Sequence, residues 1–238
     1  MRIVELLHDE DHPKVTNVDF WLKENRESSS IKISASDTEN YPNVECVDLI
    51  IIHGGSQHLW DKDADPWLYR EIEYIKEALK KDILVIGFCL GAQIIAEAIG
   101  GKVYKAKEKE VGWFNIEITM EGKKHKLLEG LEEGFKSFLW HTDHYDLPNN
   151  CTVLGYTEGA KNQIFVSHIY RAVGFQFHPE YTKENVRTYI DEYDESVWSG
   201  GKFAFGKENT LKETKVIEGN YDLFKGIFTN SINCFLNK

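Results

Sequence analysis

The chain has 238 residues, of which 42% are hydrophobic and 28% are charged, and its formal net charge at pH 7 is −11. This length suffices for one sizeable core and is too short for two large domains. The acidic balance argues against a duplex nucleic-acid surface and against anionic membranes, which both attract basic proteins, and no apolar run approaches the roughly 20 residues of a membrane span.

The first hundred residues alternate between predicted strands and predicted helices. In chain order these are a strand at 3–7, a helix at 14–25, strands around 31–33 and at 47–53, a helix at 65–82, a strand at 83–88 and a helix at 92–101. The runs VDLIIIH and ILVIGF have almost nothing polar inside, which is typical of parallel strands that are covered on both faces. This alternation predicts a three-layer α/β/α fold around a mostly parallel sheet.

The second half of the chain has a different pattern. Alternating segments predict strands at 113–120, 152–158, 163–170 and 171–178, some of them antiparallel. Helices are predicted at 182–198 and 220–236, and the Gly-, Lys- and Glu-rich segment 199–213 is predicted to be a loop. Since there is no internal repeat and no break in composition, we expect one domain over residues 1–238.

The cysteines and the N-terminus bear on the compartment. Cys46, Cys89, Cys151 and Cys234 are widely scattered and form no CxxC pair, which predicts reduced thiols rather than a disulfide framework. The first residues lack the long apolar core of a signal peptide. We therefore expect a cytoplasmic protein.

The stretch GFCLG at 87–91 places Cys89 at the corner between a buried strand and a helix. The N–H groups and the dipole of the helix N-terminus favour a thiolate and a developing oxyanion at this point. Gly87 and Gly91 let the backbone turn there, as in the G-x-S-x-G elbow of hydrolases. Cys89 is therefore predicted to be a nucleophile. The alternative is a small buried apolar residue, which is our interpretation of the other three cysteines.

A thiol nucleophile needs a base, and the base needs a group that orients it. The segment RAVGFQFHPEYT places His178 at the end of an apolar strand, and Glu180 follows two residues later, within reach of the imidazole. A loop histidine beside a capping acid is the alternative. Gly54 and Gly55 follow another buried strand and offer exposed backbone N–H groups, as an oxyanion hole requires, although a plain turn would have the same sequence.

Together these motifs resemble the class I glutamine amidotransferases of the triad type. The chain has HGGSQ at 53–57, GFCLGAQ at 87–93 and FHPE at 177–180, in the order found in that family. The resemblance covers about residues 1–195 and leaves 196–238 as a C-terminal extension. The segments PWL, VGW and WHTD with a following LP are similar to stand-alone proteins that resemble the amidotransferase domain of GMP synthase.

The resemblance implies a flavodoxin-like α/β/α sandwich and the hydrolysis of glutamine to glutamate and ammonia. Cys89 would attack the side-chain amide, His178 would transfer protons and Glu180 would hold His178. The N–H groups of Gly55 and Leu90 would form the oxyanion hole. The expected substrate pocket consists of Gly54, Gln93, Trp113, Trp140, His141, Thr142 and Asp143.

The resemblance implies no cofactor and no metal for this half-reaction. The cluster from His141 to His144 does not match a known zinc spacing and is interpreted as pocket wall. The ligand would be L-glutamine or another γ-glutamyl small molecule. Because the chain has no segment that resembles a synthetase domain, a separate synthetase subunit is the expected acceptor of ammonia, and a homo-oligomer is a further possibility.

Three other functions remain open from the sequence. A γ-glutamyl hydrolase that acts on a peptide or conjugate would share the same triad and would differ by an open pocket for the leaving amine. A non-catalytic α/β binding protein would be expected to have lost one member of the triad. A DJ-1/PfpI-like protein has a cysteine at a similar elbow but typically lacks the H-P-E segment. Two departures from the family pattern are Phe88 before the nucleophile and Ser56 in a turn that usually reads GGP.

Overall fold

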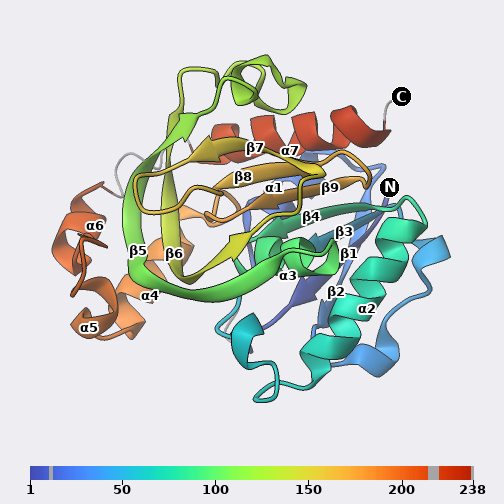
Figure 1. Ribbon diagram of the computed structural model, residues 1–238, viewed down its shortest axis with the longest axis horizontal. Helices are drawn as coiled ribbons and strands as arrows, with labels where there is room; N and C mark the ends of the chain where they lie inside the picture. The colour runs from blue at the N-terminus through green and yellow to red at the C-terminus, as the bar shows by residue number, and fades with distance from the viewer. Residues whose placement is uncertain (11–12, 214–219, 237–238) are drawn as a thin grey trace.

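The computed structural model describes residues 1–10, 13–213 and 220–236, and it has a central sheet with helices on both faces (Figure 1). The strands are β1 (Arg2–Leu7), β2 (Ser29–Ser34), β3 (Leu49–Ile52), β4 (Leu84–Phe88), β5 (Lys102–Ile118), β6 (Phe135–Asp146), β7 (Cys151–Tyr156), β8 (Ile164–Ser167), β9 (Ala172–Phe175) and β10 (Phe203–Ala204). The helices are α1 (Asn17–Glu24), α2 (Trp67–Lys80), α3 (Leu90–Ala98), α4 (Lys183–Glu192), α5 (Glu195–Trp198), α6 (Lys207–Glu213) and α7 (Asn220–Leu236).

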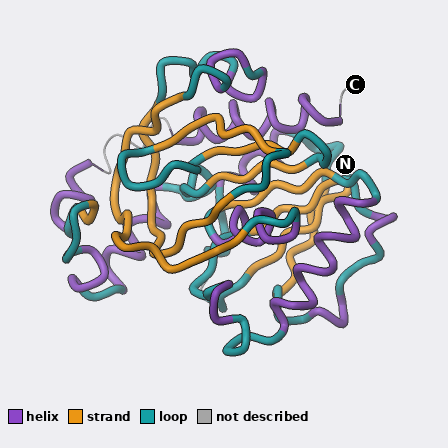
Figure 2. The backbone as a smooth tube through the Cα atoms, viewed as in Figure 1, coloured by secondary structure: helices purple, strands orange, loops and turns teal. Residues whose placement is uncertain are grey.

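The order of the elements up to α3 follows the predicted alternation of strands and helices. In the described part of the chain the sheet has ten strands, in the order β10-β5-β7-β8-β9-β4-β3-β1-β2 with β6 paired to β5. The strands from β2 to β9 in this order pair in parallel, whereas β8, β7 and β5 join them as antiparallel strands. Figure 2 shows the strands side by side, with helices and loops around them. The predicted three-layer fold with a mostly parallel sheet is therefore confirmed.

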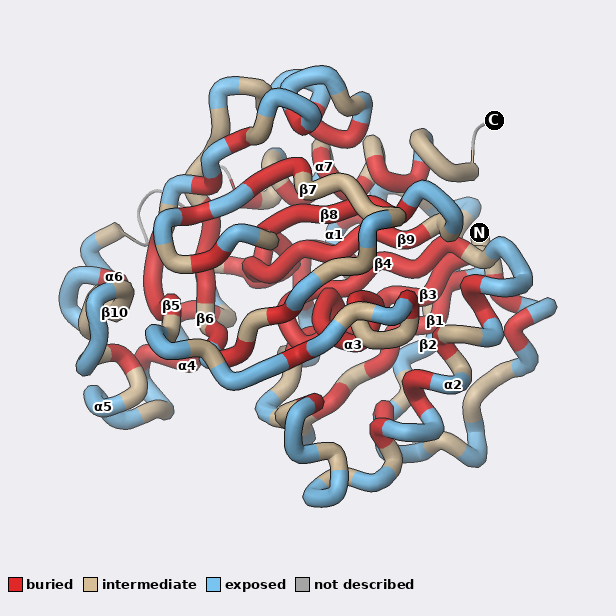
Figure 3. The backbone as a smooth tube through the Cα atoms, viewed as in Figure 1, coloured by how far each residue is buried: buried red, intermediate tan, exposed pale blue. Residues whose placement is uncertain are grey.

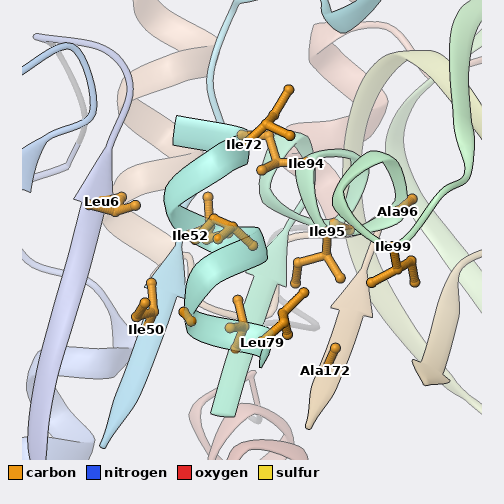
Figure 4. Close-up of a cluster of buried hydrophobic side chains, with 14 of the residues drawn as sticks. Leu6, Ile50, Ile52, Ile72, Leu79, Ile94, Ile95, Ala96, Ile99 and Ala172 are labelled. Carbon is orange, nitrogen blue, oxygen red and sulfur yellow. The ribbon is translucent and has the colours of Figure 1, made fainter. Parts of the chain in front are cut away.

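Both faces of the central strands are buried, and this explains why their sequence is apolar without alternation. Ile50 and Ile52 of β3 pack in one core cluster with α2 and α3 (Figure 4). Leu49 and Ile51 pack in a second cluster with α1 and α7. Figure 3 shows these strands buried and the outer loops exposed. Because successive side chains of a strand point to opposite faces, the single run LIII contributes to both cores.

The parallel strands position the functional residues. Since β1, β3, β4 and β9 run in the same direction, their carboxyl ends meet at one edge of the sheet. The segments that follow these ends contain Asp9, Gly55, Cys89 and His178. This is the edge at which open α/β sheets bind their ligands.

A long two-stranded ribbon of β5 and β6 reaches beyond the flanking strands (Figure 1). The sequence predicted a strand over 113–120 only, and it assigned no element to 135–146. The polar run at 102–110 has no apolar pattern, but its backbone pairs with β6, and a register shift between Lys105 and Glu110 interrupts the ladder. Backbone pairing of this kind depends on the partner strand, so the local pattern did not reveal it.

Two predictions for the C-terminal part are only partly correct. The helix predicted at 182–198 is divided into α4 and α5, because Tyr193 has an extended backbone and its ring packs 4.8 Å from that of Trp140. The predicted loop at 199–213 contains β10, which pairs with β5, and α6. Residues 214–219 and 237–238 of the predicted extension lie outside the described residues.

Among the described helices, none combines the length and the apolar character that crossing a bilayer requires.

Candidate active site

Cys89 occupies the corner between β4 and α3. Its φ of 50° lies in the left-handed region, which is uncommon for a residue with a side chain and is found at strained functional turns. A Cβ on Gly87 would lie 2.4 Å from the carbonyl oxygen of Gly91, and a Cβ on Gly91 would lie 2.1 Å from that of Ile52. Both glycines are thus required by close backbone approach, as the elbow interpretation predicted.

His178 follows β9 and is hydrogen-bonded to Glu180, with 2.8 Å between Nδ1 and Oε1. Both side chains are buried, and the imidazole stacks on the ring of Tyr181 at 4.3 Å. Gly54 lies against this imidazole, because an added Cβ would be 2.7 Å from His178 Cε1 and 3.4 Å from Cys89 Cβ. The predicted pocket residue Gly54 therefore makes room for His178, and it lies beside both His178 and Cys89.

The charge of Glu180 determines the protonation state of His178. Burial by itself would lower the pKa of His178, but the carboxylate of Glu180, together with Cys89, outweighs burial and raises the pKa to about 10. The ring is therefore an imidazolium at neutral pH. In this state His178 holds a proton that it can transfer to a departing amine.

The two predicted oxyanion donors have different surroundings. Leu90 is the first residue of α3, so its N–H group has no acceptor within the helix. Gly55 is packed against His8 and Leu90, since an added Cβ would lie 2.4 Å from His8 Cβ and 2.9 Å from Leu90 Cδ2.

Ser56 donates its N–H and its hydroxyl to the carboxylate of Asp9 at 3.0 and 2.8 Å. The serine in place of the usual proline thus fixes the turn through a contact that proline lacks a donor to make.

A cavity of about 120 Å³ contains Cys89 in its wall. Five of the seven predicted pocket residues line it: Gln93, Trp140, His141, Thr142 and Asp143. The Asp143 carboxylate is bound by His58 Nδ1 at 2.6 Å and by Trp60 Nε1 at 3.0 Å, so the segment after β3 closes this side of the cavity.

Trp113 does not belong to either cavity beside Cys89. Its side chain is 2% exposed and packs on Phe138, 5.3 Å away, in a core cluster between the ribbon and α4. The prediction that Trp113 lines the pocket is therefore wrong. The VGW motif begins at Val111, and period-two alternation along β5 points Trp113 into the core that also contains Val111.

Sequence reasoning missed Gln176. Its amide nitrogen lies 3.6 Å from Cys89 Sγ as a donor, and its Oε1 accepts a hydrogen bond from Gln93 at 3.3 Å. The residue is 1% exposed, two positions before His178. A polar residue inside the apolar run AVGFQFH was the available signal.

A second cavity, of about 240 Å³, also has Cys89 and His178 in its wall. Half of its remaining lining is aromatic, and this half comes from β6, α4 and the segments on either side of α4: Trp140, Tyr181, Tyr189 and Tyr193. Val197 of α5 and the loop residues Asp9, Gly55 and Ser56 complete the wall. The Trp140 ring packs edge-on against Tyr189 and Tyr193 at 5.1 and 4.8 Å. Cys89 thus borders two spaces, a largely polar one and a second one, called the aromatic cavity below, to which Trp140 and three tyrosines contribute.

Comparison with known proteins identifies relatives. The model of the family described as Glutamine amidotransferase class-I matches residues 18–192. The glutamine amidotransferase-like protein YfeJ of Salmonella typhimurium is 34% identical over 152 residues, which make up 63% of this chain and 63% of that protein. A glutamine-hydrolysing GMP synthase of Clostridium tetani is 28% identical over 179 residues, or 72% of this chain and 32% of the synthase.

Among solved structures, a glutamine amidotransferase from Thermotoga maritima aligns with a TM-score of 0.84 and 25% identity, over 100% of this chain and 99% of that chain. This structural match therefore extends along nearly the whole of the solved chain. In contrast, the sequence matches span less than two thirds of YfeJ and about a third of the GMP synthase.

Proposed function

The chain belongs to the glutamine amidotransferase class-I family, and we propose that it hydrolyses the side-chain amide of glutamine through a γ-glutamyl thioester on Cys89. The observation that carries the proposal is the joint position of three groups. Cys89 borders a polar cavity and shares the wall of the second cavity with His178. The Glu180 carboxylate holds His178, with 2.8 Å between Oε1 and Nδ1. This is the arrangement of a nucleophile, a base and an orienting acid.

The reaction follows from these positions. His178 holds the proton of the Cys89 thiol while the sulfur attacks the amide carbon, the C=O π bond opens, and the resulting oxyanion accepts hydrogen bonds from the N–H groups of Leu90 and Gly55. His178 then gives its proton to the nitrogen, the C–N bond breaks and ammonia leaves. Water attacks the thioester while His178 takes one of its protons, the C–S bond breaks and glutamate is released. The polar cavity around Gln93 and Asp143 holds the amino-acid end of the substrate.

A separate synthetase subunit is proposed to use the ammonia. The matching region makes up 32% of the Clostridium tetani GMP synthase, so most of that protein has no counterpart in the matched part of this chain. Residues 1–238 are proposed to form one domain that supplies ammonia to such a partner.

The test is to treat the purified chain with 6-diazo-5-oxo-L-norleucine, an electrophilic glutamine analogue, and to measure ammonia release from L-glutamine in parallel. We expect one adduct, located on Cys89 by peptide mass spectrometry, and protection from it by L-glutamine. Labelling serves as the readout even where turnover depends on a partner. An unlabelled Cys89, or labelling that L-glutamine does not reduce, would rule out the proposed site.

A second candidate function is hydrolysis of a γ-glutamyl amide with an organic amine as leaving group. It is favoured by the aromatic cavity of about 240 Å³, since Cys89 lies in its wall and ammonia needs no such space. Aromatic side chains bind apolar or aromatic groups by burial and by ring contacts. The amine would therefore carry an aromatic or apolar group.

Replacing Val197 with tryptophan is expected to fill part of the aromatic cavity. With γ-glutamyl-p-nitroanilide as substrate, kcat/KM should fall by about 10-fold or more, because lost pocket space of this kind changes discrimination by 10–200-fold. The kcat/KM for L-glutamine should stay close to wild type. No turnover of the anilide by the wild-type chain would remove this second candidate, and an equal fall for both substrates would show that the cavity does not select the leaving group.

A further inference from the structure

Three side chains with metal-ligand chemistry meet beside the pocket wall. Glu110 of β5 and His141 of β6 are directly opposite each other in the ladder, next to the register shift that begins at Lys105. A register shift of this kind bends a strand and re-aims its side chains. The rings of His141 and His144 lie 5.4 Å apart, and one donor atom from each of the three residues lies within 4.8 Å of the others.

Two polar atoms of this cluster are not satisfied by the described residues. The Nε2 atom of His144 and the Oε1 atom of Gln163 are buried and have no hydrogen-bond partner there, whereas His141 Nε2 pairs with Glu110 Oε2 at 3.0 Å. Buried polar groups are almost always paired, so two such atoms beside one carboxylate require a physical reason.

The contacts of His141 indicate which of its ring nitrogens could bind a cation. Its Nδ1 lies 3.2 Å from the carbonyl oxygen of Asp143, which can only accept, so Nδ1 carries a proton. Its Nε2 lies 3.0 Å from Glu110 Oε2, as one half of an ion pair. A metal ion that displaces the proton between these two atoms would find a ring nitrogen and a carboxylate oxygen placed as neighbouring ligands.

We propose that Glu110, His141 and His144 form a binding site for a divalent transition-metal ion, with Zn²⁺ as the best match. Two imidazoles and one carboxylate are a known ligand set for zinc, whereas Mg²⁺ and Ca²⁺ prefer oxygen ligands only. Metal–ligand distances of about 2.0–2.2 Å are shorter than donor atoms up to 4.8 Å apart allow, so the three side chains must close on the ion when it binds.

The hydrogen bonds that hold Glu110 and His141 in place are also typical of a metal site. Glu110 accepts hydrogen bonds from Thr157 Oγ1 at 2.6 Å and from Gln163 Nε2 at 2.8 Å, and these fix the carboxylate. The Asp143 carbonyl fixes the tautomer of His141 in the same way. Ligating carboxylates and imidazoles are typically held by such outer partners.

An ion can reach this cluster, and its binding has a structural consequence. His144 lies in the wall of a separate cavity of about 200 Å³ that Tyr104, Asn162 and Gln176 also line. A bound ion would link β5 to β6. One of its ligands, His141, belongs to the stretch from Trp140 to Asp143, which lines the polar cavity beside Cys89. The ion is therefore inferred to stiffen the pocket wall and takes no part in the proposed thioester chemistry.

The experiment uses the chelator-treated chain of residues 1–238 with Cys89 replaced by alanine, so that this thiol cannot bind zinc. Titration calorimetry with Zn²⁺ should give one equivalent per chain, and thermal unfolding should shift to higher temperature in its presence. Replacing His144 with glutamine should weaken binding by at least about 100-fold, because loss of a ligand costs more than the 10–100-fold of an outer-shell change. His168→Gln is the matched control, because His168 is exposed and bonded to Thr152 outside the cluster.

A second measurement guards against variants that merely misfold. Co²⁺ bound in place of Zn²⁺ should give visible absorption bands that are present in the His168→Gln protein and absent in the His144→Gln protein, with unchanged far-ultraviolet circular dichroism in both. Zn²⁺ that fails to bind the parent protein, or binds it and the His144→Gln protein equally, would overturn the proposal.

Discussion

Replacing Cys89 with alanine is expected to lower kcat for L-glutamine by at least about 10⁴-fold. Loss of the nucleophile of a triad removes the covalent route and leaves only the contribution of the oxyanion hole and of substrate binding. The polar cavity beside Cys89 stays intact, so the affinity for L-glutamine should remain close to wild type. Glutamate production by a coupled assay would give kcat, and titration calorimetry would give the affinity.

Cys151→Ala is the control for the first prediction. Cys151 is a half-buried free cysteine on β7, outside both cavities that Cys89 borders. We expect its replacement to leave kcat near the wild-type value. If both alanine variants turned over glutamine at similar rates, Cys89 would not be the nucleophile and the thioester route would have to be abandoned.

Replacing Glu180 with glutamine is expected to lower kcat by about 10³-fold or more and to move the alkaline limb of its pH profile to lower pH. An amide cannot stabilise the imidazolium, and related replacements of the orienting acid cost about 10⁴-fold in kcat. With Glu180 present, the pKa of His178 is raised to about 10, so the proton needed by ammonia is available until the pH approaches that value. Without the carboxylate, only Cys89 opposes the effect of burial, so the pKa of His178 falls and the proton is lost at a lower pH.

The same pKa shift makes a prediction about stability. Because the pKa of folded His178 is raised from 6.5 to about 10, the ring stabilises the folded state fully below pH 6.5, and this contribution is lost as the pH rises through about 10. Urea unfolding on either side of that window would measure the loss. In the Glu180→Gln protein this fall in stability should be smaller, because Cys89 is then the one group that still raises the pKa of His178.

Glu192→Gln serves as the matched control, because Glu192 is an exposed carboxylate at the end of α4. Its pH profile and its unfolding curve should follow those of the wild type. An alkaline limb that stays in place in the Glu180→Gln protein would mean that another group controls the proton of His178.

Local sequence was sufficient for the motifs and for the order of the elements. The apolar runs ending at Ile52 and Phe88 predicted buried strands, and the glycines around Cys89 predicted the corner, because steric limits at a tight turn act on adjacent residues. Glu180 is two residues from His178, so their contact was also a local matter.

The direction of the side chains on the β5–β6 ribbon could not be predicted from neighbouring residues. Trp113 belongs to the VGW segment and Trp140 to the WHTD segment, yet Trp113 points into a core and Trp140 lines both cavities. Which face of a strand is covered depends on the elements packed on it, and α4 and α5 supply that cover here.

The sequence by itself determined the class of fold, the tight corner at Cys89 and the histidine–glutamate pair, because periodicity, turn sterics and short contacts depend on neighbours along the chain. Only the tertiary structure decided that Gln176 reaches Cys89, that Asp9 holds Ser56 and that Glu110 meets two histidines. It also decided that the C-terminal helices complete an aromatic cavity beside Cys89. These contacts join segments far apart in the chain, and their geometry follows from strand order, register and packing, which no local pattern specifies.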